Sequence, residues 1–189
     1  THEVREALRK FGKPYEADIL FKYRFMIDFG IRGMGWIEVK GSPARTSTVK
    51  CKAIEASEIK PLEIMENAPL RHLAFDIECI TNGDRVPIPE KDNIIMVSMK
   101  FSPAHQGKET IVLTSKFLSG GADVVCTENE EELLKKFSEI VGQYDPDTMI
   151  GYNINNFDFP FIVGRMKEYN LPTSLGRCGK SAMIRKSMG

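Results

Sequence analysis

The sequence lacks the features that mark zinc-binding, secreted and membrane-spanning proteins. Its four cysteines lie far apart without a C-x-x-C pair, which excludes a zinc knuckle or a dithiol redox motif. No apolar run approaches the roughly 18 residues of a membrane span, and the N-terminus has no signal-peptide core. The glycines between residues 30 and 41 form no phosphate-loop pattern. We therefore expect an intracellular protein with reduced cysteines and no membrane association.

The chain of 189 residues has no net charge, yet its charges are unevenly distributed. Residues 1–71 hold 13 Lys and Arg against 10 Asp and Glu, residues 72–158 hold 7 against 15, and residues 159–189 hold 6 against 1. Such blocks occur on ordinary solvated surfaces. An acidic centre between basic segments also suits a cation-dependent site that handles a polyanion.

The segment from Leu73 to Ile80 alternates apolar and other residues with the period of a β-strand. Asp76 and Glu78 therefore share one face of an otherwise apolar strand. Two unit charges about 5 Å apart at an effective dielectric near 20 repel by roughly 3 kcal/mol, which favours a proton or a cation between them. Carboxylate oxygens on a rigid strand suit Mg²⁺ or Mn²⁺.

The remaining pattern predicts an α/β fold with a mixed sheet and flanking helices, and a domain boundary near residue 70. We expect a first helix capped by Thr1 and an aromatic segment, residues 19–29, packed in a core. The predicted strands are 36–40 and 48–57, joined by a Gly-Ser-Pro turn, then 94–101, 110–114 and a buried strand at 148–152. The run of acids at 128–132 favours the start of a helix rather than ligands. A last helix begins near Pro160, which places Asp158 at its N-terminus.

Two motifs together resemble a known family. Phe75-Asp76-Ile77-Glu78, followed by Tyr152 to Pro160 with the sequence YNINNFDFP, resembles the first and second motifs of the proofreading exonuclease of family-B DNA polymerases. Asp145-Pro146-Asp147 and Leu175-Gly176-Arg177 are similar to that family as well. Upstream, Glu16 to Phe21 with Arg24, Ile27 and Asp28 is similar to the end of the N-terminal domain of archaeal and eukaryotic members.

The resemblance implies a partial N-terminal domain over residues 1–70, an α+β segment, and a partial ribonuclease-H-like 3′→5′ exonuclease domain over residues 71–189. It implies a two-metal site for Mg²⁺ or Mn²⁺, in which Asp76 binds both ions, Glu78 binds the ion that activates water and Asp158 serves the second ion. Asn153 and Phe157 are the implied substrate-binding residues. Asn153 would hold the terminal nucleotide, whereas Phe157 would pack rather than take part in chemistry.

The chain departs from the family pattern after Asp158. The family's third motif, Tyr-x-x-x-Asp, supplies the last carboxylate, but residues 159–189 contain one acid, Glu168. No palm, fingers or thumb sequence is found. We therefore expect a piece of a DNA polymerase, with weak metal binding and slight or no catalysis by this chain alone.

The resemblance also implies partners and a place in the cell. The expected partners are single-stranded and primer-template DNA, the remainder of the polymerase chain and, through it, a sliding clamp. The expected compartment is the cytoplasm (nucleoid) of an archaeon or the nucleus of a eukaryote. Archaeal members sense uracil in the template, and the matching positions here are Ile19, Phe21 and Arg24, whereas Leu20 replaces the expected proline.

Two other functions remain open from the sequence. A nonenzymatic module could use the same fold to bind DNA or a polymerase subunit, as the missing ligand would permit. A free-standing exonuclease of the ribonuclease-H-like superfamily would need its last carboxylate within the chain, and none is found.

Overall fold

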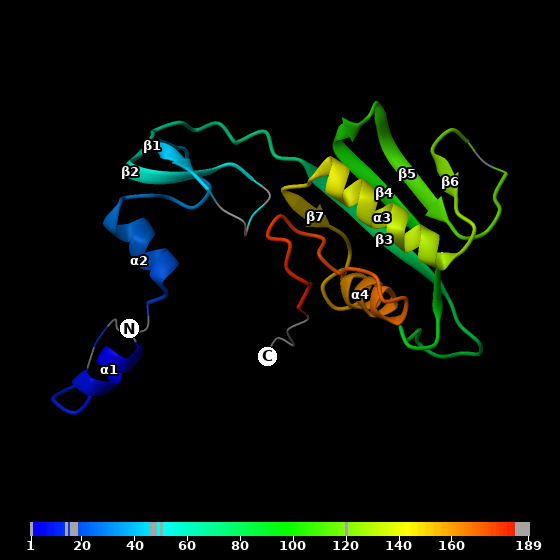
Figure 1. The fold of residues 1–189 in the computed structure, drawn as a ribbon, viewed down its shortest axis with the longest axis horizontal. Coiled ribbons are helices and arrows are strands. Elements are labelled where there is room, and N and C mark those ends of the chain that lie inside the picture. Colours follow the sequence, from blue (N-terminus) through cyan, green and yellow to red (C-terminus); the bar gives the residue numbers. More distant parts are fainter. Residues whose placement is uncertain are drawn as a thin grey trace. The chain divides into compact units, whose positions relative to one another are not determined.

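The computed structural model describes residues 2–13, 15, 19–45, 49, 51–119 and 121–183. Thr1 and the residues 16–18 of the upstream motif lie outside this part. The chain divides into two compact units (Figure 1), one of Thr1–Arg45 with Ala53–Ala68 and one of Thr46–Lys52 with Pro69–Gly189. Within the described residues, no helix is long and apolar enough to cross a membrane.

The first unit contains two short helices and a two-stranded antiparallel ribbon. They are α1 (His2–Leu8), α2 (Phe21–Asp28), β1 (Ile37–Ala44) and β2 (Ala53–Pro61). The predicted Gly-Ser-Pro turn is wrong, because Gly41 to Pro43 lie within β1. The ribbon changes register between Lys40 and Gly41, and a Cβ at Gly41 would overlap the Glu55 carbonyl oxygen. Gly41 is therefore needed for close approach of two strands rather than for a turn.

The prediction that the aromatic segment packs in a core is also wrong. No residue of α2 is buried, and Phe21 is 83% exposed. Phe21, Phe25 and Phe29 instead pack against one another along the helix, with ring centroids 6.5 and 4.7 Å apart. Two short helices and a two-stranded ribbon offer too little surface to enclose a core.

The second unit confirms the predicted α/β architecture. Its five-stranded mixed sheet has the order β6-β5-β4-β3-β7. The strands are β3 (His72–Ile80), β4 (Asn93–His105), β5 (Lys108–Thr114), β6 (Val124–Cys126) and β7 (Thr148–Ile150), and the helices are α3 (Glu130–Tyr144) and α4 (Asp158–Glu168). β4 pairs antiparallel with both β3 and β5. At the edges of the sheet, β6 pairs in parallel with β5, and β7 pairs in parallel with β3.

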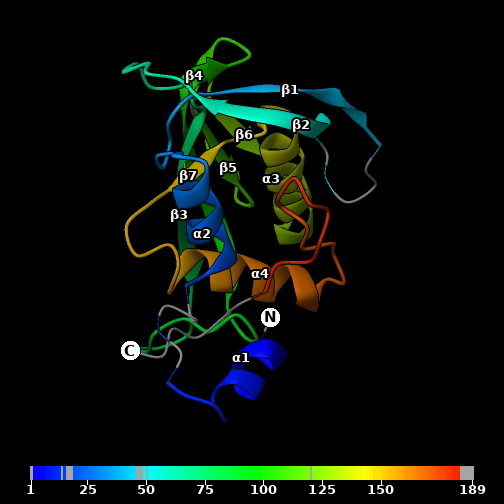
Figure 2. The ribbon, with the colours of Figure 1, turned by 90° about the vertical axis from the view of Figure 1, so that its left-hand side faces the viewer.

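Both helices of this unit pack on one face of the sheet. The Phe75 ring contacts Phe137 of α3 and Phe159 of α4, with centroids 5.6 and 5.0 Å apart. α3 lies along β4 and β5 (Figures 1 and 2). Leu73, Phe75 and Ile77 are buried in the shared core, so the side chains between them point to the other face of the sheet.

Three details of the second unit differ from the predictions. β4 and β5 run longer than expected and turn at Gln106-Gly107, where both residues have positive φ, as tight hairpin turns require. The three-residue strand β6 was not predicted, because so short a segment has no periodicity. β7 was expected to be buried, but it is an edge strand and Ile150 is 47% exposed.

Candidate functional site

Asp76 and Glu78 lie on β3 as the alternation predicts, and both side chains are exposed. They face away from the helices, opposite Ser98 and Met96 of β4. Because water screens exposed charges, the repulsion between these carboxylates is smaller than the sequence argument assumed, and it does not by itself require a bound cation.

Asp158 reaches the same strand from α4. β7 pairs in parallel with β3, and the chain then turns through residues 151–157 to begin α4 at Asp158. Asp158 Oδ1 accepts a hydrogen bond of 3.2 Å from the backbone N–H of Ile77, the residue between Asp76 and Glu78. The Asp158 side chain is only 2% exposed. Burial, with a smaller contribution from the charge of Asp76, raises the pKa of Asp158.

The turn before α4 is shaped by Asn153. Its φ of 56° lies in the left-handed region, where Asn is tolerated better than most residues. Its backbone carbonyl accepts hydrogen bonds from the N–H groups of Asn156 and Phe157, and its side-chain oxygen accepts one from Asn156 Nδ2. Phe157 packs against the core, and the centroid of its ring lies 5.5 Å from that of Phe161.

The three carboxylates supply the hard oxygen donors that Mg²⁺ and Mn²⁺ prefer. Even so, no group of three or more His, Cys, Asp or Glu side chains within the described residues could hold a metal ion. Asp158 is directed to a backbone N–H group, while Asp76 and Glu78 face solvent. The donor types therefore fit a metal site, but the present arrangement does not gather all three.

Cys79, next to Glu78, lies among the carboxylates at the end of β3. Burial, together with the smaller effects of the charges on Glu130, Asp158, Glu78 and Asp92, raises the pKa of its thiol to about 12. Glu130, from the first turn of α3, thus lies close to the candidate site. The acids at 128–132 were all expected to favour the start of a helix, but among those of the first turn of α3 Glu130 alone is buried.

A groove of about 510 Å³ crosses the sheet face opposite the helices. Asp76 lines it together with Lys100 of β4, Thr110 of β5 and Tyr152, whose side chain is 94% exposed. The groove therefore adjoins one of the candidate ligands and offers a basic and an aromatic side chain.

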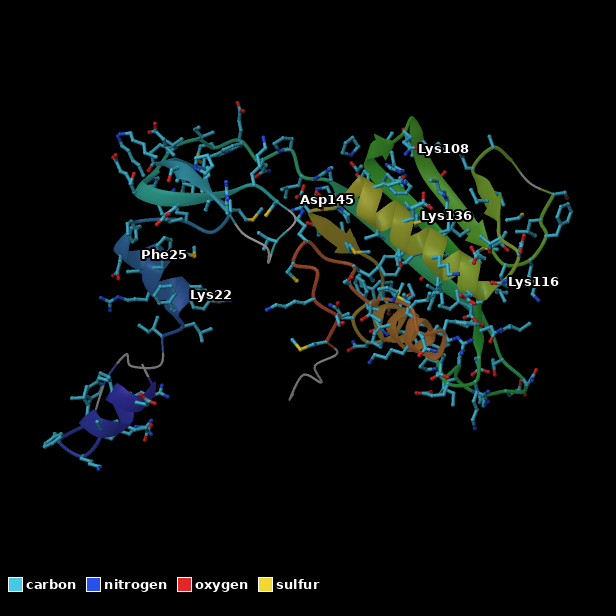
Figure 3. The ribbon with its side chains drawn as sticks, viewed as in Figure 1. Lys22, Phe25, Lys108, Lys116, Lys136 and Asp145 are labelled. Carbon is cyan, nitrogen blue, oxygen red and sulfur yellow. The ribbon has the colours of Figure 1, made fainter. Side chains whose placement is uncertain are left out.

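Two motifs that are far apart in the sequence, Asp145-Pro146-Asp147 and Leu175-Gly176-Arg177, meet in the structure. Arg177 Nε donates to Asp145 Oδ1 and its Nη2 donates to Asp147 Oδ1, both at 2.7 Å. Arg71 donates to the same two carboxylates, through its side chain to Asp145 and its backbone N–H to Asp147. Asp145 lies between α3 and β7 (Figure 3), so this cluster fixes the start of β7 beside β3.

The predicted uracil-pocket residues lie on or just before α2. Ile19 and Phe21 are exposed, and Arg24 Nε donates to both oxygens of Asp28 at 2.9 Å. No described residue of the first unit is buried, so these side chains do not line an enclosed pocket. Their role in sensing uracil stays a prediction.

The second unit is thus an α/β domain with a mixed sheet, helices on one face, two carboxylates on β3 and a third at the start of α4. The family model of the DNA polymerase family B exonuclease domain matches residues 12–188. The chain therefore belongs to that family. Exonuclease domains of this family generally use divalent metal ions.

Relatives of this chain include archaeal and eukaryotic polymerases. The chain is 36% identical over 171 residues to the DNA polymerase delta catalytic subunit of Dictyostelium discoideum, covering 85% of this chain and 16% of that protein. It is 31% identical over 183 residues to a DNA polymerase of Archaeoglobus fulgidus, covering 97% of this chain and 21% of that protein. The family B DNA polymerase structure from Pyrobaculum calidifontis matches with a TM-score of 0.73 at 29% identity, over 96% of this chain and 22% of that one. The chain thus spans less than a quarter of the length of these relatives.

Proposed function

We propose that this chain carries the first and second motifs of the 3′→5′ proofreading exonuclease of a family-B DNA polymerase. The observation that carries the proposal is the hydrogen bond from Ile77 N–H to Asp158, because it brings the second-motif carboxylate onto the strand between Asp76 and Glu78. In this proposal residues 1–70 belong to an N-terminal domain and residues 71–189 to the exonuclease domain.

Asp76, Glu78 and Asp158 are the residues that would hold two divalent ions, Mg²⁺ or Mn²⁺. Such ions activate water and stabilise the oxygens of an in-line displacement at phosphorus. The chain's own residues orient the site: Asn153 shapes the turn before α4, and Phe157 packs the turn against the core. The expected reaction is hydrolytic removal of 3′-terminal nucleotides from single-stranded DNA.

In this proposal the chain lacks the last carboxylate ligand of the metal ions, so hydrolysis of DNA by the chain alone is slight or absent. Polymerization, primer-template binding and contact with a sliding clamp belong to the longer protein, in the archaeal cytoplasm or the eukaryotic nucleus. A uracil-sensing role of Ile19, Phe21 and Arg24 remains part of the proposal, and tighter binding of uracil-containing than thymine-containing single strands would support it.

One observation favours a second candidate function. Because no group of three or more His, Cys, Asp or Glu side chains is gathered for a metal ion among the described residues, the chain would also suit a nonenzymatic module that binds DNA or a polymerase subunit. Single-strand binding that is independent of Mg²⁺ and unaffected by Asp76→Ala would favour this candidate.

The test is degradation of a 5′-labelled single-stranded DNA in Mg²⁺ and in Mn²⁺, with calorimetric titration of both ions. Asp76→Ala is compared with Asp84→Ala, which removes the same charge from an exposed loop position. We expect little or no shortening, and weak ion binding that is lost in Asp76→Ala but kept in Asp84→Ala. Efficient shortening from the 3′ end that is abolished by Asp76→Ala but not by Asp84→Ala would support the role of Asp76 in the site. It would contradict the proposal that the ligand set of this chain is incomplete. Ion binding equal in all three proteins would overturn the assignment of Asp76.

A further inference from the structure

A buried ion pair joins the two helices of the second unit. Glu130 of α3 and Arg165 of α4 are only 4% and 6% exposed. Arg165 Nε donates to Glu130 Oε1 at 2.8 Å and Arg165 Nη2 donates to Oε2 at 2.6 Å, which is the bidentate arrangement of a strong charged pair. Tyr169 adds a hydrogen bond from its hydroxyl to Glu130 Oε2 at 3.0 Å.

The same pair also binds the segment that follows β3. Arg165 Nη1 donates to the carbonyl of Pro89 at 2.7 Å, and Nη2 donates to Asn93 Oδ1 at 3.1 Å. Glu130 Oε1 accepts the backbone N–H of Ile94 at 2.7 Å. In the sheet, Asn93 and Ile94 lie opposite Ile80 and Cys79, the residues directly after Glu78. The pair therefore ties α4 to the end of β3 that carries Glu78.

A second, independent contact presses α4 against this segment. A Cβ at Gly164 would lie 2.6 Å from Pro89 Cβ and 2.9 Å from Pro89 Cγ. Only glycine allows so close an approach of the helix to Pro89. Gly164 and Arg165 thus fix the same part of α4 by shape and by hydrogen bonds.

The position of α4 decides where Asp158 lies. Asp158 begins the helix and Arg165 follows seven residues later, about 10 Å along the axis at ~1.5 Å per residue. Because a helix moves as a rigid rod over two turns, an anchor at Arg165 sets the place of the Asp158 carboxylate. Removing Arg165 alone would leave the Glu130 charge buried without a partner, in addition to the loss of the hydrogen bonds that hold α4 against the segment after β3.

We propose that Glu130 and Arg165 are positioning residues, which set the distance from Asp158 to Asp76 and Glu78 by locking α4 onto the segment after β3. The relevance of this distance to a metal site rests on the proposed function, but the positioning itself does not.

The experiment measures backbone amide exchange by NMR in the whole chain without metal or DNA. Arg165→Met is compared with Lys167→Met, which makes a similar change at an exposed position of the same helix. We expect exchange of the Ile77 amide to rise at least about tenfold in Arg165→Met, because its hydrogen bond to a carboxylate is lost. The amides of Val97 and Leu113, in the centre of the sheet, should change far less. Arg165→Lys, which keeps the charge, should restore part of the protection.

A rise that is equal at Ile77, Val97 and Leu113 would mean that the pair only stabilises the fold, and would overturn the proposal. Unchanged exchange at Ile77 would overturn it as well. If Arg165→Met does not fold, Glu130→Gln is the second variant, since it keeps the shape of the side chain and removes the charge that pairs with Arg165, and a smaller rise confined to Ile77 is expected. Ion titration separates the two proposals: a local rise at Ile77 without any metal binding by the unaltered chain would leave the positioning intact and contradict the proposed metal site.

Discussion

Gly151 shows how a single residue controls the approach to the candidate site. It follows β7 directly, and a Cβ built there would overlap the Ile154 side chain and lie 2.7 Å from the Phe75 carbonyl oxygen. The turn between β7 and α4 therefore passes too close to β3 for any side chain at this position.

We predict that Gly151→Ala lowers the free energy of unfolding by about 1–3 kcal/mol, because the added methyl group overpacks the turn. Urea unfolding followed by circular dichroism measures the change. Gly142→Ala is the matched control: a Cβ at this position in the last turn of α3 would meet nothing within 4 Å, so the substitution should raise stability by about 0.4–1 kcal/mol. Equal effects of the two substitutions would contradict the close approach at Gly151.

Arg177 gives a pH-dependent prediction at the scale of one residue. Its hydrogen bond and charge lower the pKa of Asp145, and the pKa of Asp147 is lowered by the Arg71 backbone N–H and then by Arg177. A carboxyl group with a lowered pKa stabilises the fold above its unfolded pKa, about 3.9, and loses that contribution as the pH falls through the folded value.

We therefore expect Arg177→Gln to have a lower Tm than the unaltered chain at pH 7, and the two melting curves to converge as the pH falls below about 4. Thermal melts at a series of pH values measure this. Lys180→Gln, which removes an exposed charge nearby, should leave the Tm unchanged across the series. A Tm difference for Arg177→Gln that persists at low pH would rule out the carboxylates as its cause.

At the scale of one element, α3 was predicted well because its start and its period are local signals. Asn129 caps the helix by accepting the N–H of Glu132 at 3.0 Å, and the buried residues follow the predicted apolar stripe. Its acidic first turn agrees with the favourable interaction of carboxylates with the helix dipole. The buried partner of Glu130, by contrast, comes from α4 and was not visible in the local pattern.

We predict that Asn129→Ala lowers the free energy of unfolding by about 1 kcal/mol, since one N–H group at the helix start loses its acceptor. Asn129→Ser, which keeps a capping oxygen, should stay within a few tenths of a kcal/mol. Urea unfolding of both variants is the measurement. If the Ser variant were as unstable as the Ala variant, the side-chain cap would not be the source of the stability.

At the scale of the whole molecule, burial is confined to the second unit among the described residues. Its core contains fully buried side chains such as Leu73, Val97 and Leu113, whereas no described residue before Leu73 is buried. Local stability follows buried apolar contacts, so the two units should differ strongly in protection from exchange.

We predict that amides of β1 and β2 exchange at least roughly 100 times faster than those of β3, β4 and β5. Hydrogen exchange with mass spectrometry on the intact chain reads both sets in one experiment. Comparable protection of the amides in the two-stranded ribbon and in the five-stranded sheet would show that the first unit is stabilised by something other than its own burial.

Local features of this protein can be predicted from the order of its residues alone. The alternation along β3 placed Asp76 and Glu78 on one face, and the strand, turn and proline order placed Asp158 at the start of α4. Such features depend on neighbours within a few residues, so periodicity and turn chemistry predict them. The paired motifs were specific enough to predict the family that the comparisons then confirmed.

Which distant residues meet, and which side chains are buried, depends on the folded arrangement of the elements. It pairs β7 with β3, directs Asp158 to Ile77, joins Glu130 to Arg165 and leaves the aromatic side chains of α2 exposed. These outcomes depend on contacts between segments separated by 35 to 81 residues, and on how much surface each unit can enclose. No local pattern contains that information, because burial and long-range pairing are properties of the folded chain as a whole.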